Sequence, residues 1–493
     1  MRLLLTILSI FILPIKGSSQ QIDQKGIINK AESILHSAQV SIVKMSKSYC
    51  VIKNDIGNGF VILSSKGNSK SKILAFSKDG FWDEELMPAL VNKWLGRLDK
   101  IGEDSLIFTN RTNNYLNNKR SITPLLTCHW HQSSPYNDLS PIISDGNVKT
   151  AAGCVAVAAA QIAYYWRKDN PIYTLRDTPV YPYGSAPVTY SVPKGSLNNW
   201  ELMKDSYTAN DSQESRYAAA QLCYVIGTTS YLNYASSTGG SINDASNALY
   251  SQFDLTSEYT AKSKLSQQEW EELLYNQIEK GYPVLCAGAE RDGHAFVLDG
   301  YDNESNLYHF NFGWGGAGDG YYPVDDSELS MGGYYNNQSV VYNILPKNRN
   351  ISASMNAEGI NGSEPISISV SITNNSTLDL RGLNVYFVQK DNTIQDVSNP
   401  IWQYDNIIRC DGITQQLQIK DLILNSSGTI YLTDENKCVL CELHIHDESG
   451  INSIAGNIEQ QCSIYDLRGN KVETPTKGLY LIKKEGRTIK IIK

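Results

Sequence analysis

The residue types best suited to chemistry gather around Cys154, which stands at the head of an apolar segment. Residues 150–167 read TAAGCVAVAAAQIAYYWR, and from Cys154 onward they are mostly strong helix formers. We therefore expect a buried helix that begins at Cys154, with Gly153 allowing a close approach of backbone to ligand. The unpaired N–H groups of a first helical turn favour a thiolate, the form that attacks a carbonyl. The competing interpretation is a small buried cysteine in a helical core.

The best candidate for a base is His294, which follows Cys154 by 140 residues. It stands in residues 281–301 (GYPVLCAGAERDGHAFVLDGY), where two short apolar runs flank a turn. The pattern predicts a hairpin with His294 at the start of the returning strand. A lone histidine in a strand is often structural, so the pairing with Cys154 carries the hypothesis. Asp292 and Asp299 flank this histidine and are expected at turns rather than as acid partners.

A base needs a group that orients it, and a developing oxyanion needs a donor. Asn311, in residues 309–320 (HFNFGWGGAGDG), can orient His294, and Trp314 can shield the bond between them from water. The backbone N–H of the nucleophile is one oxyanion donor, and Gln132 upstream is the best side-chain donor. Read alone, Asn311 could be a strand-end amide and Gln132 an ordinary turn residue.

Four motifs carry a resemblance to a known family. HQSSPYN, AAGCVAVAAAQI, GHAFVLDGY and NFGWGGAGDGYY, in this order, resemble the streptopain family of papain-fold cysteine peptidases across residues 121–346. The resemblance implies Cys154 and His294 as the catalytic dyad, Gln132 as oxyanion donor, and Asn311 and Trp314 as the groups that orient and shield the histidine. Phe312 departs from the family, where many members have a second Trp. Residues 332–333 resemble the family's mobile glycine loop.

The segments before this block predict an exported precursor. An apolar run follows Arg2 and ends in small and polar residues, which is the pattern of a signal peptide over residues 1–19. Residues 20–120 are expected to form a compact α+β module that resembles the family's propeptide, and so implies a zymogen. The Asn-rich stretch 110–120 is predicted to be the linker that is cut.

The segments after it are expected to be β-structure. Residues 347–450 alternate apolar and polar residues between turns, which is typical of a β-sandwich. Residues 451–493 form a separate small β unit that is similar to the type IX secretion sorting domain of Bacteroidota; the alternative is a terminal β-hairpin. The fold class predicted for the whole chain is α+β: a papain-like domain between an α+β propeptide and two β units.

Composition argues against three classes of function: nucleic-acid binding, membrane spanning and metal binding. The 493 residues carry a net charge of −8 with no basic stripe, which argues against nucleic acid, and no later segment has transmembrane length. Nine cysteines leave at least one unpaired. Cys438 and Cys441 near His444 and His446 suggest zinc, but a strand would point alternate residues to opposite faces, so no metal or cofactor is predicted.

The sequence therefore predicts a secreted or cell-surface cysteine endopeptidase, made as a zymogen and exported through the periplasm. Its expected partners are protein or peptide substrates, its own propeptide, and the secretion machinery through the tail. One alternative is an exported binding or adhesion protein with a non-catalytic papain-like scaffold. Another keeps the thiol but makes the enzyme an amidase or peptide ligase.

Overall fold

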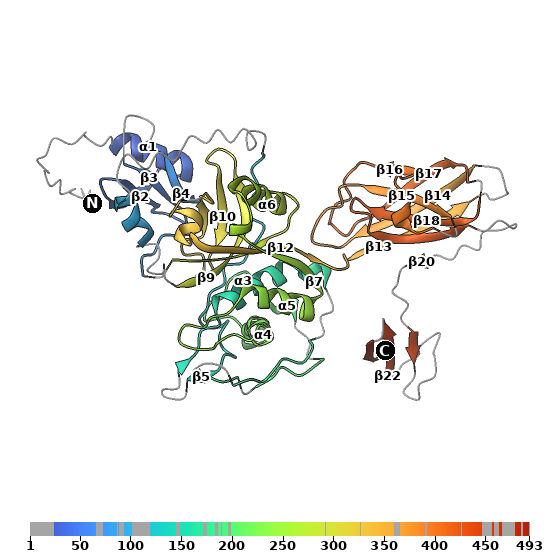
Figure 1. Ribbon diagram of the computed structural model, residues 1–493, viewed down its shortest axis with the longest axis horizontal. Coiled ribbons are helices and arrows are strands. Elements are labelled where there is room, and N and C mark those ends of the chain that lie inside the picture. The colour runs from blue at the N-terminus through green and yellow to red at the C-terminus, as the bar shows by residue number, and fades with distance from the viewer. Residues whose placement is uncertain are drawn as a thin grey trace, which may run out of the picture.

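The structure is a computed structural model, and it arranges the chain from an N-terminal α+β unit through a central block to a C-terminal sandwich (Figure 1). It describes residues 24–65, 72–85, 87, 93–100, 119–143, 148–170, 175–182, 186–188, 190–195, 199–290, 292–325, 327–358, 365–389, 392–424, 426–445, 456–457, 463–465, 479–484 and 487–492. The predicted signal peptide and most of the predicted linker lie outside these residues.

A ten-stranded sheet joins the N-terminal unit to the central block. Four strands come from the N-terminal unit, and β4 pairs with β11 where Phe76 faces Tyr321. In sheet order the strands are β1 (Val40–Met45), β2 (Tyr49–Asn54), β3 (Phe60–Ser64), β4 (Ile73–Ser77), β11 (Gly320–Tyr322), β10 (Leu307–Asn311), β9 (Gly293–Asp302), β8 (Val284–Ala289), β12 (Asn336–Pro346) and β7 (Leu255–Ala261).

Helices cover this sheet because its central strands are apolar on both faces. In β9, Ala295 and Val297 belong to one core and Phe296 and Leu298 to another, as the two-residue period of a strand requires. The first core contains α3 (Cys154–Tyr165), α4 (Gln213–Thr229) and α5 (Ile242–Phe253), and the second contains α6 (Gln267–Glu279). The N-terminal helix is α1 (Gln24–Leu35), and short 3-10 helices are η1 (Trp166–Asp169), η2 (Trp200–Leu202), η3 (Lys262–Lys264) and η4 (Ser330–Gly333).

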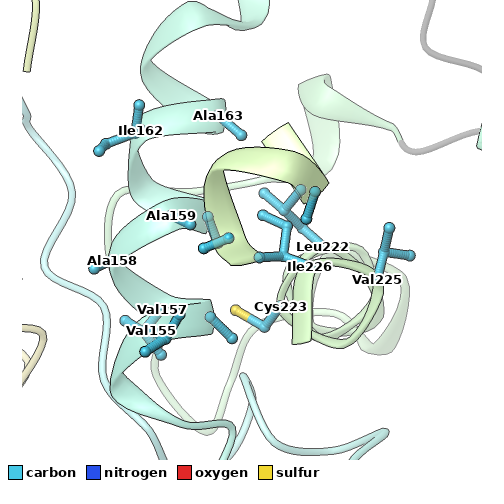
Figure 2. Packing of buried hydrophobic residues seen from close by; sticks show 14 of the residues in the cluster. Val155, Val157, Ala158, Ala159, Ile162, Ala163, Leu222, Cys223, Val225 and Ile226 are labelled. Carbon is cyan, nitrogen blue, oxygen red and sulfur yellow. The ribbon is translucent and has the colours of Figure 1, made fainter. Parts of the chain in front are cut away.

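Helix α3 is the central helix that the sequence predicts, and it begins at Cys154. Its small side chains let α4 approach closely: Ala163 points toward the helix that carries Leu222 and Ile226, whereas Ile162 points away from it (Figure 2). All residues from Val155 to Tyr164 are buried, including the polar Gln161. A helix without a polar face is stable only inside a core, so packing rather than amphipathicity fixes the position of Cys154.

The C-terminal unit is a β-sandwich with one core, as its alternating sequence predicts. The burial of β14 alternates strictly along its length, which is the pattern of a strand with one face in the core. One sheet contains β13 (Ile351–Glu358), β14 (Ile366–Asn374) and β17 (Thr414–Leu422); the other contains β16 (Trp402–Tyr404), β15 (Leu383–Gln389), β18 (Gly428–Asp434), β19 (Val439–Ile445) and β20 (Gly456–Asn457). The 3-10 helix η5 (Ile394–Asp396) lies between β15 and β16 in the chain.

The two cysteines near the end of the sandwich lie in different surroundings. Cys441 is buried in the sandwich core, while Cys438 is exposed. Among the described residues, no cluster of His, Cys, Asp and Glu could hold a metal ion, and eight cysteines are free thiols. No helix in the described ranges is both long and apolar enough to cross a membrane.

The remaining strands are β5 (Ile142–Ile143) with β6 (Val148–Lys149), and the C-terminal β21 (Ser463–Tyr465), β22 (Leu479–Lys484) and β23 (Arg487–Ile492). The last three form a separate antiparallel sheet, which agrees with the predicted terminal β unit.

Candidate active site

The backbone before α3 is shaped so that Cys154 can be its first residue. Gly153 has a φ of 94°, and a Cβ on it would lie 2.9 Å from Thr238 Cγ2, so only glycine fits this position without movement. No side chain caps the helix, which leaves its first N–H groups available. The Cys154 side chain is half-buried at this open end.

The thiol of Cys154 faces the start of β9. Burial raises the pKa of Cys154, and the backbone N–H groups of Ala295, Val155 and Cys154 itself oppose that rise. The N–H of Ala295 belongs to the residue after His294, so the sulfur lies beside the strand that carries the predicted base. The predicted nucleophile and base are therefore brought to one place, although 140 residues separate them in the sequence.

The ring of His294 is held by one hydrogen bond and a set of aromatic rings. Its Nε2 lies 2.9 Å from the carbonyl oxygen of Phe312. Trp314 stacks on the imidazole with centroids 4.9 Å apart, and Tyr334 lies at 5.1 Å. Burial among these rings lowers the pKa of His294 to about 4, so the imidazole is neutral at physiological pH.

The tautomer of His294 follows from that bond. A carbonyl oxygen only accepts hydrogen bonds, so Nε2 must carry the proton and donate it to Phe312. In the neutral ring Nδ1 then keeps its lone pair. Among the contacts of the described residues, none joins this ring to the Cys154 sulfur by a hydrogen bond.

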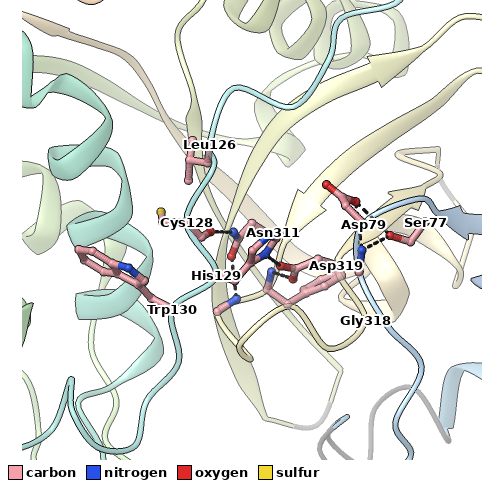
Figure 3. Close-up of polar contacts among 12 residues, drawn as sticks. Ser77, Asp79, Leu126, Cys128, His129, Trp130, Asn311, Gly318 and Asp319 are labelled. Carbon is pink, nitrogen blue, oxygen red and sulfur yellow. Dashed lines mark hydrogen bonds and ion pairs between the residues drawn. The ribbon is translucent and has the colours of Figure 1, made fainter. Parts of the chain in front are cut away.

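Asn311 lies in β10, which pairs with the strand that carries His294, but the hydrogen bonds of its side chain go to other groups. Its Oδ1 accepts from Gly313 N at 3.1 Å and from Gln161 Nε2 at 3.0 Å. Its Nδ2 donates to the Cys128 carbonyl at 2.8 Å (Figure 3). The group that holds the imidazole is therefore the carbonyl next to Asn311, and the sequence could not reveal it because a backbone acceptor leaves no residue-type signal.

Gln132 is brought to the start of α3 by its backbone. Its carbonyl accepts from Ala152 N at 3.0 Å, two residues before Cys154. Its side chain is half-buried. The structure thus gathers Gln132, Cys154, His294, Asn311 and Trp314 around the junction of α3 and β9.

Buried ionisable groups that the sequence reasoning passed over lie behind this junction. Asp319 accepts from Phe312 N at 2.8 Å, and its other oxygen lies 3.3 Å from His129 Nδ1 (Figure 3). The bond to Asp319 is the main cause that raises the pKa of His129. Burial raises the pKa of the Asp319 carboxyl. Asp319 therefore holds the backbone N–H of Phe312, and the carbonyl of the same residue holds His294.

The prediction that Asp299 stands at a turn is wrong. It lies inside β9 and is fully buried, where Oδ1 is 2.6 Å from His309 Nδ1 and Oδ2 accepts from Leu126 N at 3.0 Å. A buried carboxylate is tolerated because these partners compensate it. Asp299 therefore does not act on His294, which lies in the same strand. Its partner is His309 on the neighbouring β10.

The N-terminal unit contacts the loops that border the site. A helical segment, residues 93–100, bonds Trp94 Nε1 to the Leu329 carbonyl at 3.1 Å, just before η4. Arg97 and Lys93 both pair with Glu290, at 2.5 and 3.2 Å. Glu290 lies in the turn between β8 and β9, four residues before His294. One segment thus holds both the turn before His294 and the loop at residues 329–333.

The η4 loop has the backbone of a glycine-dependent turn. Met331, Gly332 and Gly333 all have positive φ, at 51°, 66° and 96°. A Cβ on Gly332 would lie 2.8 Å from the Phe312 ring. A Cβ on Gly333 would lie 3.1 Å from Trp94 Cδ1. These two glycines let the loop fit between the N-terminal unit and the aromatic rings around His294.

Comparisons with known proteins identify both units. Residues 130–322 match the Peptidase C10 family, and residues 20–101 match the Spi protease inhibitor family. Streptopain of Streptococcus pyogenes serotype M28 is 28% identical over 331 residues, which are 62% of this chain and 82% of that protein. The thiol protease/hemagglutinin PrtT of Porphyromonas gingivalis is 29% identical over 231 residues, 44% of this chain and 26% of that protein.

Among solved structures, the prointerpain A fragment of Prevotella intermedia is similar, with 26% identity and a TM-score of 0.49 over 63% of this chain and 99% of that one. Active interpain A has 29% identity and a TM-score of 0.41 over 45% of this chain and 95% of that one.

The fold, the cysteine at the head of the central helix and the matched families define a papain-like cysteine endopeptidase made as a zymogen. Residues 130–322 form a peptidase unit of the Peptidase C10 type that is similar to streptopain, and the N-terminal unit acts as an intramolecular inhibitor of this peptidase. Its substrates are proteins, and the alternative of a non-catalytic binding scaffold is not supported by these relatives.

Proposed function

We propose that Cys154 is the nucleophile of this endopeptidase and His294 its general base. The observation that carries the proposal is the position of the Cys154 sulfur against the backbone N–H of Ala295, directly beside His294. Because Nε2 of His294 is bonded to a carbonyl, Nδ1 is the nitrogen that takes the thiol proton. Proton transfer then gives the thiolate that attacks the scissile carbonyl carbon.

Phe312 and Asn311 orient the base together. The peptide unit between Phe312 and Gly313 accepts from His294 at its oxygen and donates to Asn311 Oδ1 from its nitrogen. Donation at one end of an amide makes its oxygen a better acceptor, because hydrogen bonds in a chain polarise one another. Asn311 therefore acts on the base through one peptide unit rather than by direct contact.

Trp314 shields this arrangement. Its ring covers the imidazole at an interplanar angle of 24°, and Phe312 stacks behind it at 4.9 Å. Stacked rings exclude water from the Nε2 bond and so strengthen it. An aromatic ring at position 312 preserves this packing where other family members have Trp.

The remaining steps use the helix start and Gln132. The tetrahedral oxyanion accepts hydrogen bonds from the Cys154 backbone N–H and the Gln132 side-chain amide. His294 Nδ1 then gives its proton to the leaving amine, and the C–N bond breaks to leave a thioester. A water molecule, deprotonated by His294, attacks the thioester and releases the acid and the free thiol.

Maturation and export complete the proposal. Cleavage in the 110–122 segment separates the inhibitory unit from the peptidase domain, which we place at residues 121–346. The signal peptide at residues 1–19 directs the chain into the periplasm, and the tail at residues 451–493 directs it across the outer membrane to the cell surface. The sandwich at residues 347–450 stays with the peptidase.

The test is a comparison of two cysteine variants in the matured enzyme. Cys154→Ala should abolish casein hydrolysis and labelling by an epoxide inhibitor of thiol peptidases. Cys286→Ala is the matched control, because Cys286 is a fully buried thiol in β8 that bonds to its own strand. Residual hydrolysis by Cys154→Ala, or equal loss in both variants, would refute the assignment of the nucleophile.

A further inference from the structure

A polar residue stands where the central helix would be expected to be wholly apolar. Gln161 is fully buried in α3, between Ala160 and Ile162. Burying an amide without hydrogen-bond partners is unfavourable, so a buried glutamine needs partners for its oxygen and its nitrogen. Gln161 follows Cys154 by seven residues, or two helical turns, so both side chains lie on the same face of α3.

The amide of Gln161 is bonded at both ends to segments that build the site. Its Oε1 accepts from Trp130 N at 3.2 Å and lies 3.6 Å from the Cys128 sulfur. Its Nε2 donates to Asn311 Oδ1 at 3.0 Å. One side chain therefore connects the helix of Cys154 with the strand of Asn311 and with the segment that leads to Gln132.

The orientation of both amides is fixed by backbone groups. Trp130 N only donates, so Gln161 must turn its oxygen to it and its nitrogen to Asn311. The Cys128 carbonyl only accepts, so Asn311 must turn its nitrogen there. Asn311 Oδ1 is left facing Gly313 N, which is the orientation that supports the Phe312 carbonyl.

From these contacts we propose that Gln161 is a positioning residue for catalysis. It fixes the Asn311 amide, and through the peptide unit between Phe312 and Gly313 it fixes the ring of His294. It also holds Trp130, two residues before the oxyanion donor Gln132. The proposal rests on the proposed function of His294 and assigns Gln161 no contact with substrate.

The first test is Gln161→Met in the matured enzyme, with active sites counted by titration. Methionine keeps the length of the side chain and removes its hydrogen bonds. We expect kcat to fall about 10- to 100-fold with little change in KM, because a base displaced by about 1 Å can lose that much. Gln252→Met is the matched control: Gln252 is a buried glutamine in α5 that bonds Arg176 N and Thr229 Oγ1, away from the site.

A pH profile separates positioning from general stability. In Gln161→Glu, a protonated carboxyl can still donate to Asn311 Oδ1, whereas an ionised one turns two acceptors toward each other. The variant should therefore approach wild-type kcat at acidic pH and lose it as pH rises, a limb that the wild type lacks. A wild-type profile in this variant would contradict the proposal.

A double-mutant cycle tests the route. If Gln161 acts through Asn311, Gln161→Met should cost little further kcat in an Asn311→Ala background. Additive losses, or a lowered melting temperature with unchanged kcat per titrated site, would overturn the inference. Failure of the proposed function is distinguishable, because it would appear as hydrolysis by Cys154→Ala whatever the Gln161 variants do.

Discussion

At the scale of single residues, the environment of the proposed nucleophile and of the proposed base favours their uncharged forms. Burial raises the pKa of Cys154 and lowers the pKa of His294 to about 4. Both shifts have desolvation as their first cause, and desolvation disfavours the thiolate and the imidazolium alike. Both shifts therefore oppose the formation of a thiolate–imidazolium pair in the precursor.

The pKa of His294 makes a prediction about folding stability. The unfolded chain binds a proton at His294 below about pH 6.5, whereas the folded chain does so only near pH 4. The contribution of His294 to the free energy of unfolding should be constant above pH 6.5 and decrease as pH falls toward 4, by roughly 3 kcal/mol in all. Urea unfolding of Cys154→Ala and of Cys154→Ala/His294→Gln, from pH 4 to 8, measures this contribution as the difference between two curves.

The difference between the two unfolding curves is needed because other histidines change the free energy of unfolding with pH in the opposite direction. His129 and His309 have raised pKa values, so they contribute stability that is present at low pH and lost as pH rises through those values. They are common to both proteins and cancel. Two parallel curves would show that His294 is hydrated in the precursor, contrary to the packing of Trp314 and Tyr334 around it.

At the scale of elements, the sequence predicted what depends on pattern and missed what depends on backbone contacts. The start of α3 and the hairpin of β8 and β9 follow from an apolar run after Gly153 and from two apolar runs around a turn. The Phe312 carbonyl left no signal, because any residue supplies that acceptor. Gln161 did leave one, as a single polar residue within an apolar helix, but its partners come from segments 31 and 150 residues away.

The contact between the turn after β4 and the loop after β10 predicts how latency can be weakened. A Cβ on Gly80 would lie 2.1 Å from the Asp319 carbonyl oxygen, so Gly80→Ala requires the N-terminal unit to move. The uncleaved precursor should then react with an epoxide inhibitor about ten times faster than the wild type, since a loss of about 1.4 kcal/mol in docking raises the open population tenfold.

Gly96→Ala is the matched control for this experiment. Gly96 lies in the 93–100 helical segment with nothing within 4 Å of a Cβ, and alanine favours a helix there. Its precursor should label no faster than the wild type. Equal labelling of the Gly80 and Gly96 variants would mean that the Gly80 contact does not restrain the inhibitory unit.

At the scale of the whole molecule, the inhibitory unit and the peptidase share one core. Tyr49, Phe60 and Trp94 belong to the same cluster as Phe296 and Phe310, and the sheet runs without a break from β1 to β7. Removing the unit therefore exposes apolar surface beside the site, as well as releasing Glu290 and the η4 loop. The cost of exposing that surface keeps the precursor closed until the chain is cut.

The sandwich is attached to the other end of α3. Asp169, in η1 directly after that helix, accepts from Asn350 N at 3.1 Å and from Thr377 N at 2.9 Å. The Leu378 side chain lies against Gly281, where an added Cβ would be 2.7 Å from Leu378 Cδ2. Arg381 donates to the Glu279 carbonyl at 2.6 Å. These contacts join the sandwich to the peptidase at both η1 and α6.

This attachment predicts coupled unfolding. Asp169→Ala leaves two backbone N–H groups without their charged acceptor, a loss of roughly 2–3 kcal/mol. We expect calorimetry of the matured enzyme to resolve a separate, earlier transition of the sandwich in this variant, with kcat on a short peptide unchanged. Asp177→Ala is the control, because Asp177 accepts from Lys194 N at 2.6 Å in an exposed turn. A single transition at the wild-type temperature in Asp169→Ala would show that the carboxylate does not hold the two units together, leaving the Leu378 and Arg381 contacts to do so.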